Sequence, residues 1–261
     1  MIVKEFFMKK TTLFLGILCF LIAGLGAQNA ESIIRESRLA MSVDSMFMQA
    51  RMLNTTHSGV DLERVFDWYS QDDQTGSRML FVFQRPASIA NIRFLSIEDT
   101  DGQRDYYVSI PSMSRIRHIS SSDEGGRFMG TDFSYSDLSF MGRSPGLDTH
   151  HLLREENVDG RPCFVIESTP KDVSYQYSRT LQWIDKRNNV IRKAEFYDSR
   201  NALVKRLEVT ESQTFNSRLY PKTITMTRIS ENTTTTIMID DINFDEKISQ
   251  DVFSVENLSS S

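Results

Sequence analysis

The chain has 261 residues and a formal net charge of -5, from 30 Lys and Arg against 35 Asp and Glu. Hydrophobic residues make up 39% and charged residues 25% of it, which are globular rather than disordered or collagenous proportions. Without a basic surplus to neutralise phosphates, we expect no nucleic acid as partner. Two cysteines are too few for a small disulfide scaffold, and the length suits one or two domains, including a single large all-β domain.

The first 27 residues have the pattern of a secretory signal peptide. Lys9 and Lys10 form a positive start, and Thr11–Leu25 is an uncharged, mostly apolar run that is short for a membrane span. Cys19 is an unsuitable lipidation site, because the apolar run continues past it. We place the cleavage site after Ala27, and the alternative is an uncleaved N-terminal anchor.

Residues 28–261 are predicted to form one domain. No later apolar run is long enough to span a membrane, and neither a repeat nor a linker divides the chain. Cys163 is the only cysteine after the signal peptide, so core burial rather than a disulfide must hold the fold. It begins the apolar run Cys163–Ile166, where we expect a buried side chain rather than a reactive thiol.

Hydrophobic periodicity predicts an N-terminal helix over Glu31–Ala40, followed mainly by strands. The helix would place Ile33, Ile34 and Ser37 on one face. The strands are predicted over Phe47–Thr55, Met79–Phe83, Asn91–Glu98, Tyr106–Ile110, His151–Asn157, Cys163–Ser168, Leu181–Asp185, Val190–Tyr197, Leu203–Phe215, Leu219–Ile229 and Thr233–Phe244.

Two stretches between these strands differ from them. Arg115–Phe128 is polar and rich in Ser and Gly, and Asp132–Met141 is expected to form a short helix. Turns such as Asp159-Gly160 give the strands the spacing of hairpins, which is typical of a sandwich or barrel. The absence of strand–helix alternation excludes a doubly wound parallel sheet.

Gly142-Arg143-Ser144-Pro145-Gly146 fits the G-x-S-x-G pattern of hydrolases on paper. The oxyanion hole of such enzymes needs the N–H of the residue after the serine, and Pro145 has none. The only later histidines, His150 and His151, follow at once, so a Ser-Pro-Gly turn is the better interpretation. A hydrolase using Ser144 is therefore a weak hypothesis, weaker than the two binding functions considered below. We predict that the protein is not an enzyme.

The sequence gives no support for a metal or another cofactor. It has four histidines, at 57, 118, 150 and 151, and contains neither HExxH nor CxxC. The methionines have two interpretations. Met41, Met46, Met48, Met52, Met129 and Met141 are near the two predicted helices, where flexible thioethers suit a surface that repacks around variable apolar ligands. The alternative is ordinary core filling.

Several segments resemble a known family. Asp105–Pro111 leads to a basic segment, Arg115–Arg117, and then to the box Gly126–Leu138, in which Thr131 stands where serine is usual. Further agreement covers Gln182–Asp185, Lys193–Asp198, Leu203–Lys205, Tyr220–Lys222 and Asp251–Phe253. In these residues the chain resembles the bacterial outer-membrane lipoprotein-sorting proteins, in the broad LolA-like branch.

The resemblance implies a mainly β fold, namely an unclosed, curved antiparallel β-barrel (a half-barrel) with short helices covering its concave face. It also implies a periplasmic carrier that binds lipid or the acyl chains of a lipoprotein and moves this cargo toward the outer membrane. Its partners would include an inner-membrane transporter and an outer-membrane acceptor. The alternative is a non-catalytic accessory subunit that docks to an envelope lipid transporter.

The concavity is expected to be lined by apolar side chains of the predicted strands, although alternation lets only one face of each strand contribute. These candidates are Phe81, Phe83, Ile92, Phe94, Val108, Phe164, Ile166, Trp183, Ile224 and Met226. Contacts of a lid or loop are expected from Arg85, Arg115, Arg117, Met129, Asp132, Phe133, Tyr135 and Leu138. Arg85 is part of an Arg-Pro element that resembles one in LolA carriers, and a buried Asp132 between Arg115 and Arg117 would explain the box.

Overall fold

The computed structural model describes residues 30–56, 59–73, 75–113 and 115–259. The predicted signal peptide, residues 1–27, lies outside this part of the chain. Within the described ranges, the structure has no helix that combines the length and the apolar character required to cross a membrane.

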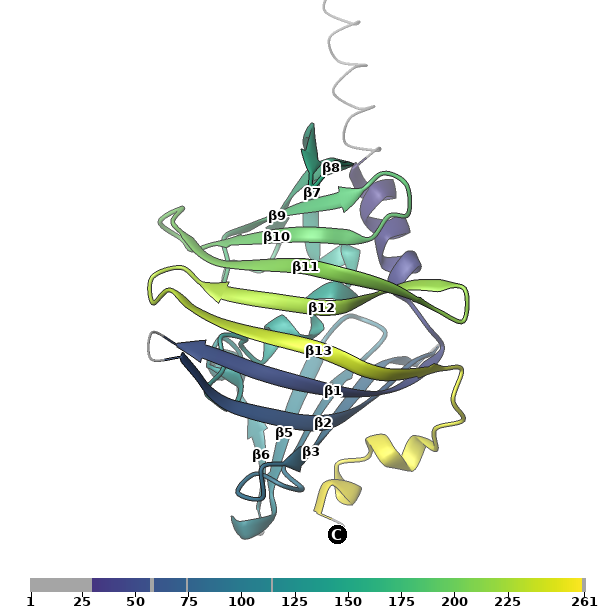
Figure 1. Cartoon of the computed structure of the whole chain (residues 1–261), viewed down its shortest axis with the longest axis vertical. Helices are drawn as coiled ribbons and strands as arrows, with labels where there is room; N and C mark the ends of the chain where they lie inside the picture. Colours follow the sequence, from purple (N-terminus) through teal and green to yellow (C-terminus); the bar gives the residue numbers. More distant parts are fainter. Residues whose placement is uncertain (1–29, 57–58, 74, 114, 260–261) are drawn as a thin grey trace, which may run out of the picture.

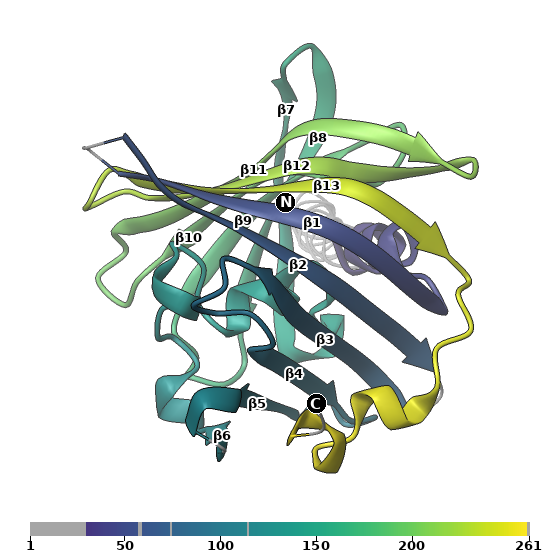
Figure 2. The same cartoon turned by 60° about the horizontal axis from the view of Figure 1, so that its bottom comes forward.

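The protein is built on one antiparallel sheet of 13 strands, which curves strongly and does not close (Figures 1 and 2). It is the half-barrel that the resemblance implied. The strands are β1 Ser45–Thr56, β2 Gly59–Asp73, β3 Gly76–Arg85, β4 Arg93–Glu98, β5 Arg104–Ile110, β6 Arg115–Ile119, β7 Asp148–Val158, β8 Arg161–Pro170, β9 Arg179–Asp185, β10 Ile191–Tyr197, β11 Leu203–Phe215, β12 Arg218–Arg228 and β13 Thr233–Phe244.

The strand order across the sheet is β6-β5-β4-β3-β2-β1-β13-β12-β11-β10-β9-β8-β7. Strands β1 to β6 form one meander and β7 to β13 another, and the pairing of β1 with β13 joins them. Met48 lies opposite Ile242 and Met52 opposite Ile237 in this central pair. The free edges of the sheet are therefore β6 and β7, which are adjacent in the sequence order of strands but lie at opposite ends of the sheet.

Two strands were not predicted, β2 and β6. In β2, Arg64 and Phe66 lie on the same face and both are buried, while Val65 lies on the opposite face, so the simple alternation of apolar and polar residues is broken. In β6, Arg115 and Arg117 are exposed, as is common on an edge strand that carries charge.

The helices are short, apart from the N-terminal helix over residues 30–41. Ile33, Ile34 and Ser37 of this helix are all buried, as the periodicity predicted. The helix expected over Asp132–Met141 is a shorter 3-10 helix, Ser136–Gly142. The other 3-10 helices are Pro111–Met113, Ser121–Asp123, Phe128–Gly130, Pro145–Leu147, Gln250–Phe253 and Glu256–Ser259.

Apolar side chains cover both faces of the sheet. The largest cluster lies on the concave side and joins the N-terminal helix to most of the strands. On the outer face, the C-terminal 3-10 helices bring Phe253 and Leu258 against Leu80 and Leu95 of β3 and β4. A separate outer cluster surrounds Cys163, whose side chain is 0% exposed and whose pKa is raised to about 11, mainly by burial. This thiol is buried, as predicted.

Candidate functional site

The segment between β6 and β7, residues 120–147, which we call the plug, occupies the concavity (Figure 2). It has to connect the opposite edges of the sheet, and it runs across the concave side. Phe128, Phe133, Leu138 and Phe140 are each at most 8% exposed and belong to the concave cluster. The ring of Phe128 lies 5.0 Å from that of Phe94, so the plug packs directly on the sheet.

Most of the predicted lining residues lie in this concave cluster. The residues buried in it are Phe81, Phe83, Ile92, Phe94, Val108, Ile166, Ile224 and Met226, and Phe164 packs against it. Their part in ligand binding stays a prediction. Trp183 was placed wrongly: it lies on the outer face with Cys163 and Val165. Because side chains alternate along β9, Ile184 points inward in its place.

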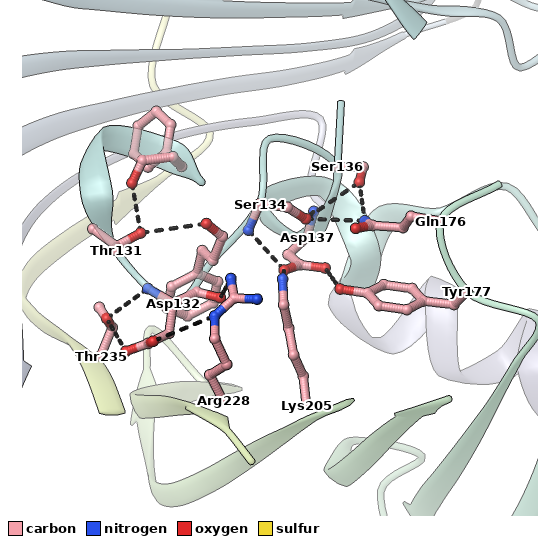
Figure 3. Close-up of polar contacts among 12 residues, drawn as sticks. Thr131, Asp132, Ser134, Ser136, Asp137, Gln176, Tyr177, Lys205, Arg228 and Thr235 are labelled. Carbon is pink, nitrogen blue, oxygen red and sulfur yellow. Dashed lines mark hydrogen bonds and ion pairs between the residues drawn. The ribbon is translucent and has the colours of Figure 1, made fainter. Parts of the chain in front are cut away.

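A buried ion pair holds the middle of the plug to the sheet (Figure 3). The Lys205 ammonium on β11 donates to the Asp137 carboxylate across 2.6 Å, and these side chains are 3% and 0% exposed. The Tyr177 hydroxyl donates to the other carboxylate oxygen at 2.7 Å, and the Ser134 amide donates at 2.7 Å. Burial lowers the pKa of Lys205, an effect that Asp137 opposes, and burial followed by Asp137 raises the pKa of Tyr177.

A second buried carboxylate, that of Asp132, holds an earlier part of the plug to the sheet (Figure 3). It accepts hydrogen bonds from the hydroxyls of Thr233 at 2.6 Å and Thr235 at 2.8 Å, both on β13. The nearest arginine is Arg228, whose Nε atom lies 3.8 Å away. Asp132 is therefore buried as the box suggested, but the arginine beside it comes from β12 rather than from the segment around Arg115.

Arg64 on β2 holds the tip of the plug. No role was predicted for this residue from the sequence. Its side chain donates to the carbonyl of Met129 at 3.0 Å and to the side chain of Asn54 at 3.0 Å. Asn54 in turn donates to the carbonyl of Gly130 at 3.3 Å. Arg64 is 7% exposed, and burial lowers its pKa. Met129 and Gly130 have φ of 50° and 75°, so this tip turns through left-handed backbone.

Of the other residues predicted to form lid contacts, one packs on the concave cluster, one forms an ion pair and two are exposed. Tyr135 packs on the concave cluster, with its ring 5.7 Å from that of Phe94. Arg117 pairs with Asp123 of the plug at 3.2 Å, and both side chains are more than half exposed. Arg115 is exposed on β6, and Arg85 is exposed at the end of β3. Among the described residues, neither Arg85 nor Arg115 forms an ion pair.

The plug leaves an apolar cleft at one end of the concavity. The cleft has an empty volume of about 820 Å³, counted to its open mouth. It lies between the end of the N-terminal helix, the 3-10 helix Ser136–Gly142 and strands β1, β2, β3, β12 and β13. Its apolar lining is Met41, Val43, Met46, Trp68, Met79, Leu138, Met141, Tyr220, Pro221, Ile224 and Ile239. Three of the methionines singled out in the sequence, and Ile224 among the predicted lining residues, line this cleft.

A second, polar cavity adjoins this cleft. We call it the polar chamber; its empty volume is about 1400 Å³, again counted to open solvent. It lies between β5, the plug and the segment after β8, and its walls carry serine and tyrosine hydroxyls together with charges of both signs. Arg104 and Ser139 line both cavities, so they form the partition between them. Arg104 is held there by an ion pair with Glu98.

Ser144 and His150 line the same small cavity, but within the described ranges no hydrogen bond joins the Ser144 hydroxyl to a base. The buried imidazole of His150 is engaged elsewhere, since its Nδ1 atom lies 2.8 Å from the Ser168 hydroxyl. Its Nε2 atom lies 3.1 Å from the carbonyl of Pro145, to which only an N–H can donate. The described residues also contain no group of three or more His, Cys, Asp or Glu side chains arranged to hold a metal ion.

The unclosed antiparallel half-barrel with short helices across its concave face is the fold that the resemblance to LolA-like proteins implied. A protein-family model described as "-like: Uncharacterized protein" matches residues 75–260. The chain belongs to the family of that model. No curated protein matches the sequence.

Solved structures agree with this assignment. The crystal structure of a DUF1329 family protein from Desulfovibrio piger is 26% identical, with a TM-score of 0.84 over 89% of this chain and 99% of that one. A protein from Vibrio parahaemolyticus described as an outer membrane lipoprotein-sorting protein domain is 25% identical, with the same TM-score and the same two coverages. A LolA superfamily protein from Nitrosomonas europaea is 20% identical with a TM-score of 0.68 over 87% and 98% of the chains, which shows the shared fold.

Proposed function

We propose that this protein is a non-catalytic periplasmic carrier that holds the acyl chain of a lipid or lipoprotein in the apolar cleft. One observation carries the proposal: the plug fills most of the concavity but leaves a cleft lined by Met41, Met46, Met79 and Met141. Thioethers are flexible and polarizable, so such a lining can adapt to acyl chains of different lengths. Burial of each methylene contributes about 0.8 kcal/mol, which makes a shielded passage through water favourable.

The relatives support the same function. A similar protein from Vibrio parahaemolyticus is described as a lipoprotein-sorting protein domain. The predicted signal peptide over residues 1–27 would deliver the chain to the periplasm, with residues 28–261 as one carrier domain. In this proposal the cargo comes from an inner-membrane transporter and passes to an acceptor in the outer membrane.

The test is native mass spectrometry of the mature protein purified from its own envelope. A carrier should retain a set of bound masses that differ in acyl-chain steps. Met41→Gln and Met141→Gln place a polar amide in the cleft and should lower the bound fraction several-fold. Met113→Gln is the matched control, because Met113 is 63% exposed and does not line the cleft.

The same measurement distinguishes the carrier from the alternative, an accessory subunit docked to an envelope lipid transporter. The observation that favours this alternative is that the plug fills most of the concavity. The docking subunit would be the correct assignment if three results were found together. The protein would have no bound mass, none of the three methionine substitutions would have an effect, and a transporter would co-purify stably with the protein.

A further inference from the structure

Most charged side chains that line the polar chamber already form ion pairs or hydrogen bonds. Arg104 is paired with Glu98, and Arg143 forms a two-pronged contact with Asp148, with N–O distances of 2.8 and 3.1 Å. Asp172 accepts hydrogen bonds from the amide and hydroxyl of Ser174, both at 2.8 Å. These groups already have their counter-charges or hydrogen bonds, so they add little attraction for a ligand.

Besides Asp172, whose carboxylate already accepts two hydrogen bonds from Ser174, Glu124 and Lys171 lack an oppositely charged contact among the described residues. Glu124 is half-buried, and only its backbone carbonyl accepts hydrogen bonds, from Ser136. Burial is the largest effect on its carboxyl group and raises the pKa, although Arg104 and Arg143 act in the opposite direction from a distance. The ammonium of Lys171 donates only to the carbonyl of Gly146, at 2.7 Å. The carboxylate of Glu124 and the ammonium of Lys171 are therefore available for contacts with a ligand in the chamber.

The chamber is also adjacent to the place proposed for an acyl chain. Arg104 and Ser139 belong to the walls of both cavities. The Ser139 hydroxyl lies 3.1 Å from the hydroxyl of Tyr106, which lines the chamber. An apolar space and a polar space that share a wall match a molecule with an apolar chain and a polar head group.

We propose that the ligand is an amphiphile with a zwitterionic head group, whose acyl chain lies in the apolar cleft and whose head group lies in the polar chamber. The anionic part of the head group, such as a phosphate, contacts Lys171, and its amine donates to the carboxylate of Glu124. This inference rests on the proposed carrier function and specifies the class of its ligand. No bond is made or broken.

The test compares how tightly the mature protein binds two single-chain lysolipids that have the same acyl chain. Both lipids are kept below their critical micelle concentrations. Lysophosphatidylethanolamine carries a phosphate and an amine, whereas lysophosphatidylglycerol carries a phosphate and a glycerol without an amine. Native mass spectrometry titrations should show the amine-bearing lipid binding roughly tenfold more tightly, because a charge-assisted hydrogen bond is worth about that factor.

Substitutions separate the two contacts. Glu124→Gln should abolish the preference for the amine-bearing lipid and leave the affinity for lysophosphatidylglycerol within about twofold. Lys171→Gln should weaken both lipids alike, roughly tenfold. Glu156→Gln on β7 is the matched control for removal of a negative charge, since Glu156 lies outside the chamber. Circular dichroism and thermal unfolding verify that each variant is folded.

The two proposals fail in different ways. If neither lysolipid binds and no acyl species is retained, the carrier function itself is overturned. If both lipids bind equally, or if Glu124→Gln leaves the preference intact, the head-group assignment is overturned while the carrier function stands.

Discussion

The ammonium of Lys205 and the carboxylate of Asp137 form an ion pair of 2.6 Å that is almost completely removed from solvent. Lys205 belongs to the sheet and Asp137 to the plug, so this pair connects the covering segment to the strands beneath it. The Tyr177 hydroxyl and the Ser134 amide satisfy further acceptor positions of the carboxylate. Such a fully bonded pair fixes one arrangement of the plug rather than adding much net stability.

We expect removal of either partner of this pair to be strongly destabilising. Asp137→Asn or Lys205→Met should each lower the free energy of unfolding by about 3–5 kcal/mol, because the remaining charge stays buried without a partner. The double variant should lose much less than the sum of the two single losses. Urea unfolding of all four proteins measures the coupling, and strict additivity would contradict the pairing.

The buried tyrosines predict a loss of stability in alkali. Burial raises the folded-state pKa of Tyr106 and Tyr177 above the ordinary value of about 10. The unfolded chain then loses these protons first, so the stabilisation is complete below about pH 10 and declines as the pH rises toward the folded-state values. Urea unfolding at pH 8, 10 and 11 should show this decline.

Tyr106→Phe identifies the source of the alkaline effect. Phenylalanine keeps the ring and removes the ionisable hydroxyl, which here contacts Ser139. The decline above about pH 10 should therefore be smaller in this variant, even if its stability at pH 8 is lower by about 1 kcal/mol. An unchanged slope would mean that other groups cause the alkaline unfolding.

Arg64 is predicted to control the local opening of the plug tip. Arg64→Lys keeps the charge but loses the fork that contacts both Met129 and Asn54. Amide hydrogen exchange around residues 129–130 should accelerate by roughly tenfold, while exchange in the central strands is little changed.

A matched control for Arg64→Lys exists on the neighbouring strand. Arg51 on β1 pairs with Asp240 at 2.7 Å, but both side chains are about 40% exposed. Arg51→Lys should change both stability and plug exchange little, because exposed ion pairs contribute at most about 1 kcal/mol. Equal effects of the two substitutions would show that burial of Arg64 has no special role.

Ser144→Ala tests the hydrolase hypothesis directly. Both ring nitrogens of His150 are hydrogen-bonded, to Ser168 and to a carbonyl, so this imidazole is not free to activate Ser144. The set of bound masses and their abundance should be the same as in the unsubstituted protein. Accumulation of an uncleaved ester or acyl substrate in the variant alone would restore the enzymatic interpretation.

The sequence predicted some elements to the residue and missed others for physical reasons. β11 and β13 were predicted at their observed bounds, because apolar residues two positions apart, in Leu207–Val209 and in Ile237–Ile239, favour strands, even though register shifts follow in both strands. β2 was missed because its apolar residues do not alternate regularly and one of its buried positions is taken by the cation Arg64. Trp183 was assigned to the wrong face, since an outer-face cluster buries it as fully as the concavity would.

Long-range partners were beyond what one sequence indicates. The Gly126–Leu138 box pointed to the plug, and within it Asp132 is buried as expected. Its partners Thr233 and Thr235, however, lie 101 and 103 positions further along the chain. Lys205 stands 68 residues from Asp137. No local periodicity encodes such pairs, so they follow only from the topology of the sheet.

The central pairing of β1 with β13 has a consequence for the order in which the molecule is completed. β1 is the first strand to leave the ribosome and β13 the last, so the edge of β1 has no neighbour until nearly the whole chain has been made. The two meanders can assemble from local hairpins, whereas their union requires closure of a loop of almost the full chain length. Biogenesis therefore depends on keeping an early, apolar strand from pairing with other chains until its own last strand arrives.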